Sequence, residues 1–169
     1  LSEEFIRFIE KGVLLSQIPE DSFKSKKVKA EFVLKGIRND DLSVIVDAID
    51  ISRDLVSRPS NMLNPDSFQE YVKDLVQRDS YLSFKFLSQK DLEKQNMHLH
   101  LAVNAGSAME ARSFIIEYNP ERSTEAPIVL VGKGLMYDSG GLYLKPYPHM
   151  NDMHGDMGGA ATVVAIMSA

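Results

Sequence analysis

The sequence predicts an α/β protein, because helical and strand patterns alternate along the chain and a short apolar run stands among them. Residues 127–131 (PIVLV) contain four aliphatic residues without a polar break. Such a run is typical of a strand that is buried on both faces of a parallel sheet. The 169 residues, 44% hydrophobic and 25% charged, have the composition of an ordinary globular protein with roughly one domain.

The first half of the chain predicts three helices and one strand. Apolar residues in 2–16 recur on one helical face, and residues 28–37 alternate as a strand does. Asp40 and Asp41 can cap a helix that runs to about Arg58 and ends before Pro59. The next helix opens at 64–66 (NPD), and its apolar residues follow the 3.6-residue repeat: Phe68, Tyr71, Val72, Leu75 and Val76.

The second half predicts two strands, over 84–87 and 113–118, in addition to the apolar run. A short helix is expected over 89–95, with Ser88 as its cap, and an apolar helix over 160–169. That last helix has no C-cap signal, and Leu1 is not an initiator methionine. We therefore expect the chain to be a fragment of a longer protein.

Composition excludes several classes of function. A net charge of −5 argues against a general nucleic-acid binder, which usually carries a basic patch. No apolar run approaches the roughly 20 residues that a membrane-spanning helix needs. Without cysteine, the chain has no disulfide framework, thiolate zinc site or thiol nucleophile. These features predict a cytoplasmic protein.

The residues that can carry chemistry are concentrated in 131–161, directly after the apolar run, where most of the chain's ten glycines lie. In open α/β sheets, ligands bind beyond the carboxyl ends of strands. A dinucleotide fingerprint fails, because Tyr137 stands where the third glycine belongs. A P-loop also fails, because Gly134 follows Lys133 in place of serine or threonine.

Two aspartates in this stretch leave two interpretations open. Asp138 precedes Gly140 and Gly141, and Asp156 lies among further glycines. Carboxylates suit Mg²⁺ or Mn²⁺ and are accepted by Zn²⁺, and small neighbours let the backbone approach a compact site. Alternatively, Asp138 forms a turn and Asp156 caps the helix that follows.

The hydroxyl and imidazole groups indicate no further site. The four histidines, His98, His100, His149 and His154, do not form the His-Glu-x-x-His motif, and we expect them at the surface or in packing. The chain contains no Gly-x-Ser-x-Gly elbow, so a serine hydrolase is not expected.

Two segments in this stretch, 131–146 (VGKGLMYDSGGLYLKP) and 150–161 (MNDMHGDMGGAA), resemble the leucine aminopeptidase family of dinuclear metallopeptidases. Residues 52–65 (SRDLVSRPSNMLNP) are similar to a further family pattern, and the similarity extends over 40–169. The resemblance implies a three-layer α/β catalytic domain with a mixed, largely parallel central sheet. Residues 40–169 would form its first part, and residues 1–39 the tail of a non-catalytic N-terminal domain with the linker.

The resemblance also implies roles for particular residues. Lys133 matches the lysine that ligates one metal through a neutral amine, Asp138 the bridging aspartate, and Asp156 a further ligand of the metal that Lys133 binds. Lys145 matches the cationic catalytic lysine, which stabilises the tetrahedral intermediate. Met153 aligns with a methionine of the substrate side-chain pocket, although ordinary core packing would explain it equally well. Substrate would thus contact Lys133, Asp138, Lys145 and Met153.

In such a family, two divalent ions, Mn²⁺ or Zn²⁺, serve the removal of single residues from peptides with a free N-terminus, usually in a cytoplasmic hexamer. The family's later Asn-Thr-Asp-Ala-Glu-Gly-Arg motif does not occur in these 169 residues. The chain would therefore carry half of the site and be inactive alone. The alternative is a non-catalytic interaction or scaffold module that retains a partial metal site.

Overall fold

The computed structural model describes residues 2–16, 40–118 and 126–169. Its elements, in chain order, are α1 (Glu3–Ser16), α2 (Asp40–Ser57), α3 (Pro65–Val76), β1 (Leu82–Leu87), α4 (Gln89–Lys94), α5 (His98–Asn104), β2 (Ser113–Tyr118), the 3₁₀ helix η1 (Met153–Met157) and α6 (Gly158–Ser168). The strand predicted over 28–37 lies outside the described residues. The other predicted helices, and the strands over 84–87 and 113–118, are confirmed with small shifts of their ends.

Local capping explains where two of the helices begin. The Asn64 side chain accepts hydrogen bonds from the backbone N–H groups of Asp66 and Ser67, and the Ser67 hydroxyl accepts one from Asn64 N. Ser88 and Asp91 form the same reciprocal capping box at the start of α4. Each box satisfies backbone donors that would otherwise have no partner in the first helical turn.

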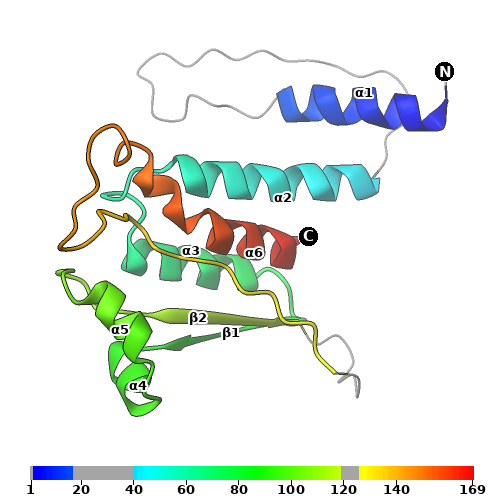
Figure 1. Ribbon diagram of the computed structural model, residues 1–169. Coiled ribbons are helices and arrows are strands. Elements are labelled where there is room, and N and C mark those ends of the chain that lie inside the picture. Colours follow the sequence, from blue (N-terminus) through cyan, green and yellow to red (C-terminus); the bar gives the residue numbers. More distant parts are fainter. Residues whose placement is uncertain (1, 17–39, 119–125) are drawn as a thin grey trace.

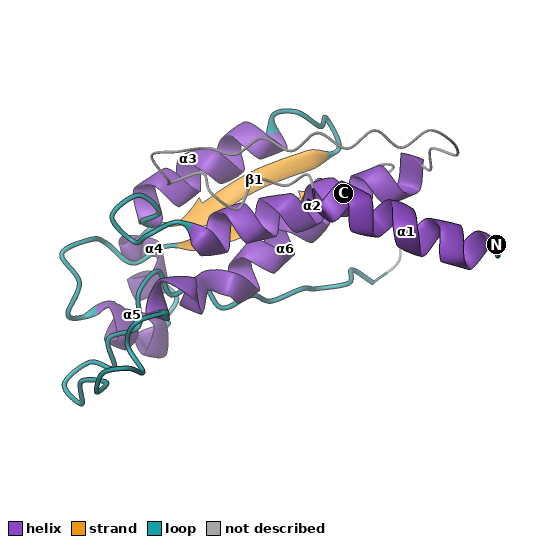
Figure 2. Cartoon of the chain, turned by 90° about the horizontal axis from the view of Figure 1, so that it is seen from above, coloured by secondary structure: helices purple, strands orange, loops and turns teal. Residues whose placement is uncertain are grey.

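Helices α1, α2, α6 and α3 lie in layers over one face of a small sheet, and α4 and α5 lie at one end of it (Figure 1). α1 lies on α2, α2 packs against α6, and α6 lies between α2 and α3. Seen from above, α6 runs beside α2 and over the sheet (Figure 2). The core between these layers consists of apolar residues from α2, α3, η1, α6 and the turn after α2: Leu55, Leu63, Phe68, Val72, Leu75, Val76, Met157, Ala161 and Val164.

The sheet consists of β1 and β2, which pair antiparallel with Phe84 opposite Ile116 and Phe86 opposite Phe114. Because strand side chains alternate between faces, Phe84, Phe114 and Ile116 all lie on the face toward the helices. Phe114 meets Phe68 of α3 edge to face, with ring centroids 5.5 Å apart. This contact joins the sheet to the helical layer that positions the candidate site.

The prediction of a buried parallel strand over 127–131 is wrong for this structure. These residues form no strand, and Ile128 and Val131 are 92% and 90% exposed. A strand needs a neighbour to accept and donate its backbone hydrogen bonds, and the two strands among the described residues pair with each other. The α/β class is confirmed, whereas the sheet in the described part of the chain is antiparallel.

One helix, α5, was not predicted from the sequence. Residues 98–101 (HLHL) alternate as a strand would, yet they form the first turn of α5.

None of the helices that the structure describes is long and apolar enough to cross a membrane.

Candidate metal centre

A close backbone contact fixes the start of the candidate site against α6. The Lys133 carbonyl accepts a hydrogen bond from Ala160 N at 2.8 Å. A Cβ placed on Gly132 would lie 2.7 Å from Ala160 N and closer still to the Gly159 carbonyl, and one on Gly159 would lie 2.7 Å from Lys133 N. Glycine is therefore required on both sides of the contact, and Lys133 is held at the N-terminal end of α6.

Lys133 and Asp156 form the first of two ion pairs. Lys133 Nζ lies 2.7 Å from Asp156 Oδ2, with the aspartate side chain 20% exposed. The interpretation of Asp156 as a helix cap is wrong, because Met157 occupies the N-cap position of α6 and no side chain caps that helix. The carboxylate instead turns toward Lys133, a residue far away in the sequence.

Asp138 and Lys145 form the second ion pair, with Asp138 Oδ2 2.6 Å from Lys145 Nζ. The other oxygen of Asp138 accepts a hydrogen bond from Gly140 N at 2.9 Å. Gly140 has a φ of +90°, a conformation that favours glycine, and Lys145 N donates to the Ser139 carbonyl at 2.9 Å. The turn interpretation of Asp138 thus holds for one carboxylate oxygen, while the second faces a cation.

Met153 connects this loop to η1. Its sulfur atom lies 2.9 Å from Lys145 Nζ, and its carbonyl accepts a hydrogen bond from Asp138 N at 3.4 Å. The Tyr137 hydroxyl donates to the Met150 carbonyl at 3.1 Å. The family resemblance implied either a substrate pocket or core packing for Met153, and in the structure its sulfur contacts Lys145, the lysine for which the resemblance implies a catalytic role.

The electrostatics of the site follow from these pairs. The hydrogen bond to Asp156 raises the pKa of Lys133, and the charges of Asp156 and Asp138 act in the same direction. The Lys145 ammonium, followed by Gly140 N–H, lowers the pKa of Asp138. Two carboxylates and two ammonium groups therefore lie in one loop system, and each carboxylate is paired with one ammonium group.

The donor set suits part of a divalent metal site. Asp156 Oδ2 is buried, with Lys133 Nζ 2.7 Å away, and no other donor among the described residues is bonded to it. Two carboxylates and one amine are ligands that Mn²⁺ and Zn²⁺ accept. Within the described ranges no group of three Asp, Glu, His or Cys side chains could hold a metal ion. The residues present therefore fit as some of the ligands of such a site, and further ligands would have to come from elsewhere.

None of the four histidines is bonded to these groups among the described residues, and His154 is half-buried in η1. His98 and His149 are exposed, and His100 makes a 3.1 Å hydrogen-bonding contact with the Arg112 carbonyl through Nε2. This agrees with the prediction of surface and packing roles.

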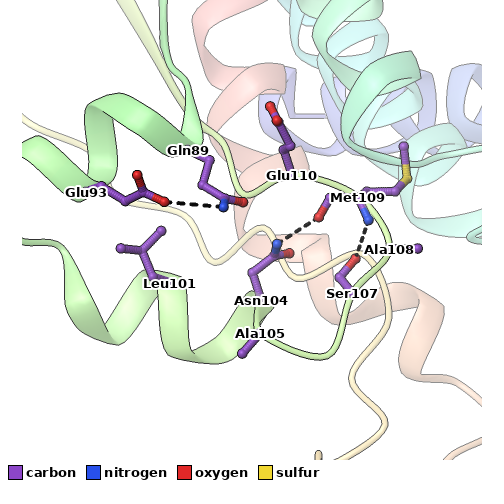
Figure 3. A pocket seen from close by; sticks show the side chains of 9 residues that line it. All are labelled: Gln89, Glu93, Leu101, Asn104, Ala105, Ser107, Ala108, Met109 and Glu110. Carbon is purple, nitrogen blue, oxygen red and sulfur yellow. Dashed lines mark hydrogen bonds between the residues drawn. The ribbon is translucent and has the colours of Figure 1, made fainter.

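A separate pocket of about 370 Å³ lies between α4, α5 and the loop before β2 (Figure 3). Its polar groups bond to one another: Gln89 donates to Glu93, Asn104 donates to the Met109 carbonyl, and Ser107 accepts from Met109 N. It shares no lining residue with the two ion pairs.

Substitution of Gly132 by alanine is expected to destabilise the protein, because the new methyl group collides with backbone atoms that cannot move without shifting α6. We expect a loss of about 1–3 kcal/mol in the free energy of unfolding, measured by urea denaturation. Gly106→Ala is the matched control, since no atom lies within 4 Å of the added Cβ. An unchanged stability for Gly132→Ala would show that Lys133 is not positioned by this contact.

Comparison with known proteins assigns the chain to a family. The family described as "Cytosol aminopeptidase family, catalytic domain" matches residues 50–169. The chain belongs to this family of peptidases.

Individual relatives extend over nearly the whole chain. A probable cytosol aminopeptidase of Histophilus somni is 36% identical over 180 aligned positions, which cover 97% of this chain and 36% of the relative. The bottromycin maturation enzyme BotP in complex with Mn has a TM-score of 0.77 at 30% identity, covering 96% of this chain and 35% of BotP. Apo leucyl aminopeptidase from Trypanosoma cruzi has a TM-score of 0.70 at 30% identity, covering 76% and 25%. The chain thus spans about a third of the length of the curated relatives that it matches.

Proposed function

We propose that this chain is the first part of the catalytic domain of a metal-dependent leucyl-type aminopeptidase, with residues 1–39 belonging to the preceding domain and linker. The observation that carries the proposal is the pairing of Lys133 with Asp156 and of Lys145 with Asp138 in one loop system against the start of α6. The family assignment supplies the class of reaction, and the loop supplies residues of the chemical types that this reaction needs.

In this proposal Lys133, Asp138 and Asp156 are metal ligands, and Lys133 contributes the lone pair of its neutral amine. The Asp156 carboxylate stabilises the ammonium form of Lys133, so binding of the cation must drive off that proton. When bound, two divalent ions supply Lewis acidity for the scissile carbonyl and lower the pKa of water. Mn²⁺ is supported by the similar structure of BotP, which is a complex with Mn, and Zn²⁺ by the ligand types.

Lys145 remains cationic in the proposed mechanism. Its ammonium group would stabilise negative charge that develops on the carbonyl oxygen in the transition state, and it would carry its charge from a partly buried position, with 28% of the side chain exposed. Met153, in contact with Lys145, would form an apolar wall for the first side chain of the substrate. Such a wall favours leucine-like residues.

The proposal extends to assembly and location. A homohexamer rests on the family resemblance, and a cytoplasmic location on the name "cytosol aminopeptidase" that the Haemophilus influenzae relative carries. Peptides with a free N-terminus are the proposed substrates.

The test is hydrolysis of Leu-p-nitroanilide by a full-length protein that contains this segment, with Mn²⁺ or Zn²⁺ added. We expect about 1–1,000 turnovers per second. With the N-acetylated substrate we expect a rate at least about 100-fold lower, which is roughly the loss in rate when one contact to the transition state is removed. Absence of hydrolysis in the metal-loaded protein would support the alternative of a non-catalytic interaction module. One observation favours that alternative: the described residues contain no group of three Asp, Glu, His or Cys side chains that could hold a metal ion.

A further inference from the structure

Both aspartates of the candidate metal centre are engaged by ammonium groups at ion-pairing distance. Lys145 Nζ lies 2.6 Å from Asp138 Oδ2, and Lys133 Nζ lies 2.7 Å from Asp156 Oδ2. The formal charges of these four side chains sum to zero. A divalent cation that binds either carboxylate therefore competes with a positive charge that belongs to the protein itself.

The two lysines differ in what a metal ion can do with them. Lys133 can lose its proton and become a ligand, so that it stays beside Asp156. Lys145 is proposed to keep its charge, and an ammonium group has no lone pair to offer a metal ion. It would lie within a few ångströms of the cation and repel it, so Lys145 has to move away from Asp138 when the cation binds.

Lys145 is also held in its present position by more than the ion pair. Its ammonium group contacts the Met153 sulfur at 2.9 Å, and its backbone N–H closes the 139–145 turn through the Ser139 carbonyl. The Lys145 and Asp138 side chains are 28% and 24% exposed, so water screens their attraction less than it would on an open surface. The pair therefore stabilises the loop from Asp138 to Lys145 before any cation arrives.

We propose that Lys145 is an internal competitor for Asp138, which orders the loop and weakens the binding of divalent cations until it is displaced. The inference rests on the proposed function, because it takes Asp138 to be a metal ligand. One consequence links loading to catalysis: the event that seats a cation on Asp138 also frees the Lys145 ammonium group for the carbonyl oxygen of a substrate.

The test uses a full-length protein that contains this segment, and compares the wild type with Lys145→Met, which keeps most of the apolar side chain and removes the charge. We expect the Kd for Mn²⁺, measured by EPR titration of free Mn²⁺, to fall about three- to tenfold. In EDTA, the same variant should melt about 1–4 °C lower, because the loop loses its ion pair. Opposite changes in metal affinity and stability separate competition from general damage, which would weaken both.

Two further variants complete the design. Lys73→Met removes a lysine whose Nζ lies 2.9 Å from Glu70 Oε1 on an exposed face of α3, and it should leave the Kd for Mn²⁺ unchanged. Lys133→Met frees Asp156 but removes a ligand, so it should weaken Mn²⁺ binding. If Lys145→Met does not fold in EDTA, Lys145→Gln is measured in its place, and the same two results decide.

The outcomes distinguish the inference from the function on which it rests. In one outcome, Lys145→Met binds Mn²⁺ no more tightly than the wild type, while Lys133→Met binds it more weakly. Lys145 is then not a competitor, and the assignment of the metal ligands remains valid. If the wild type binds no Mn²⁺, or Lys133→Met binds it as well as the wild type does, the ligand assignment is wrong and the inference falls with it.

Discussion

Replacement of Lys133 by arginine in a full-length protein that contains this segment is expected to abolish one of two metal sites, although the positive charge is preserved. A neutral amine can donate a lone pair to a metal ion, whereas a guanidinium group remains protonated at working pH and has no acceptor. Loss of an outer-shell partner of a metal ligand lowers activity by up to about 100-fold. Lys133 is proposed to be a ligand itself, so we expect kcat to fall by more than that. Elemental analysis should find one metal ion per chain.

Lys145→Arg is the matched control for this prediction. Lys145 is assigned a cationic role beside Asp138, and arginine retains the charge, so both metal ions and part of the activity should remain. Two metal ions of normal affinity in Lys133→Arg would show that Lys133 is a charged loop residue that pairs with Asp156 and has no ligand role.

The second large effect concerns the 169-residue chain by itself, which we expect to be inactive. Catalytic zinc sites usually take three protein ligands for each ion. Lys133, Asp138 and Asp156 are three donors in all, and the described ranges provide no third carboxylate or imidazole beside them. The described residues therefore cannot hold both ions in working geometry.

The measurement is Leu-p-nitroanilide hydrolysis by the purified chain with saturating Mn²⁺ or Zn²⁺, in parallel with the full-length protein. The chain should give no turnover above the Lys133→Arg variant of the same length. Turnover of about 1–1,000 per second would mean that the described residues form a complete site and that the donor count is wrong.

Local signals were sufficient to predict most helices and both paired strands. Asn64 and Ser88 cap helices through bonds to residues two or three positions away, so the sequence contains the whole arrangement. The 127–131 segment was different, because whether an apolar run becomes a buried strand depends on neighbours that no local pattern specifies. No pattern in the sequence predicted α5, whose N-cap residue Met97 makes no side-chain capping bond.

The candidate site was predictable in its members but not in its geometry. The family resemblance selected Lys133, Asp138, Lys145 and Asp156 from among many charged residues. It did not predict that each aspartate would contact a lysine, or that Gly132 would lie against Gly159, because these contacts join residues distant in sequence. The cap interpretation of Asp156 failed because the backbone entering α6 passes through η1, which turns the carboxylate away from the helix end.

The most direct test of the proposed metal centre is anomalous diffraction from crystals of this protein grown with Mn²⁺. We predict an anomalous peak within coordination distance of Lys133 Nζ and of the carboxylates of Asp138 and Asp156, with Lys145 Nζ moved away from Asp138. A crystal at saturating Mn²⁺ in which both lysine–aspartate pairs remain intact, with the anomalous peak elsewhere or missing, would contradict it.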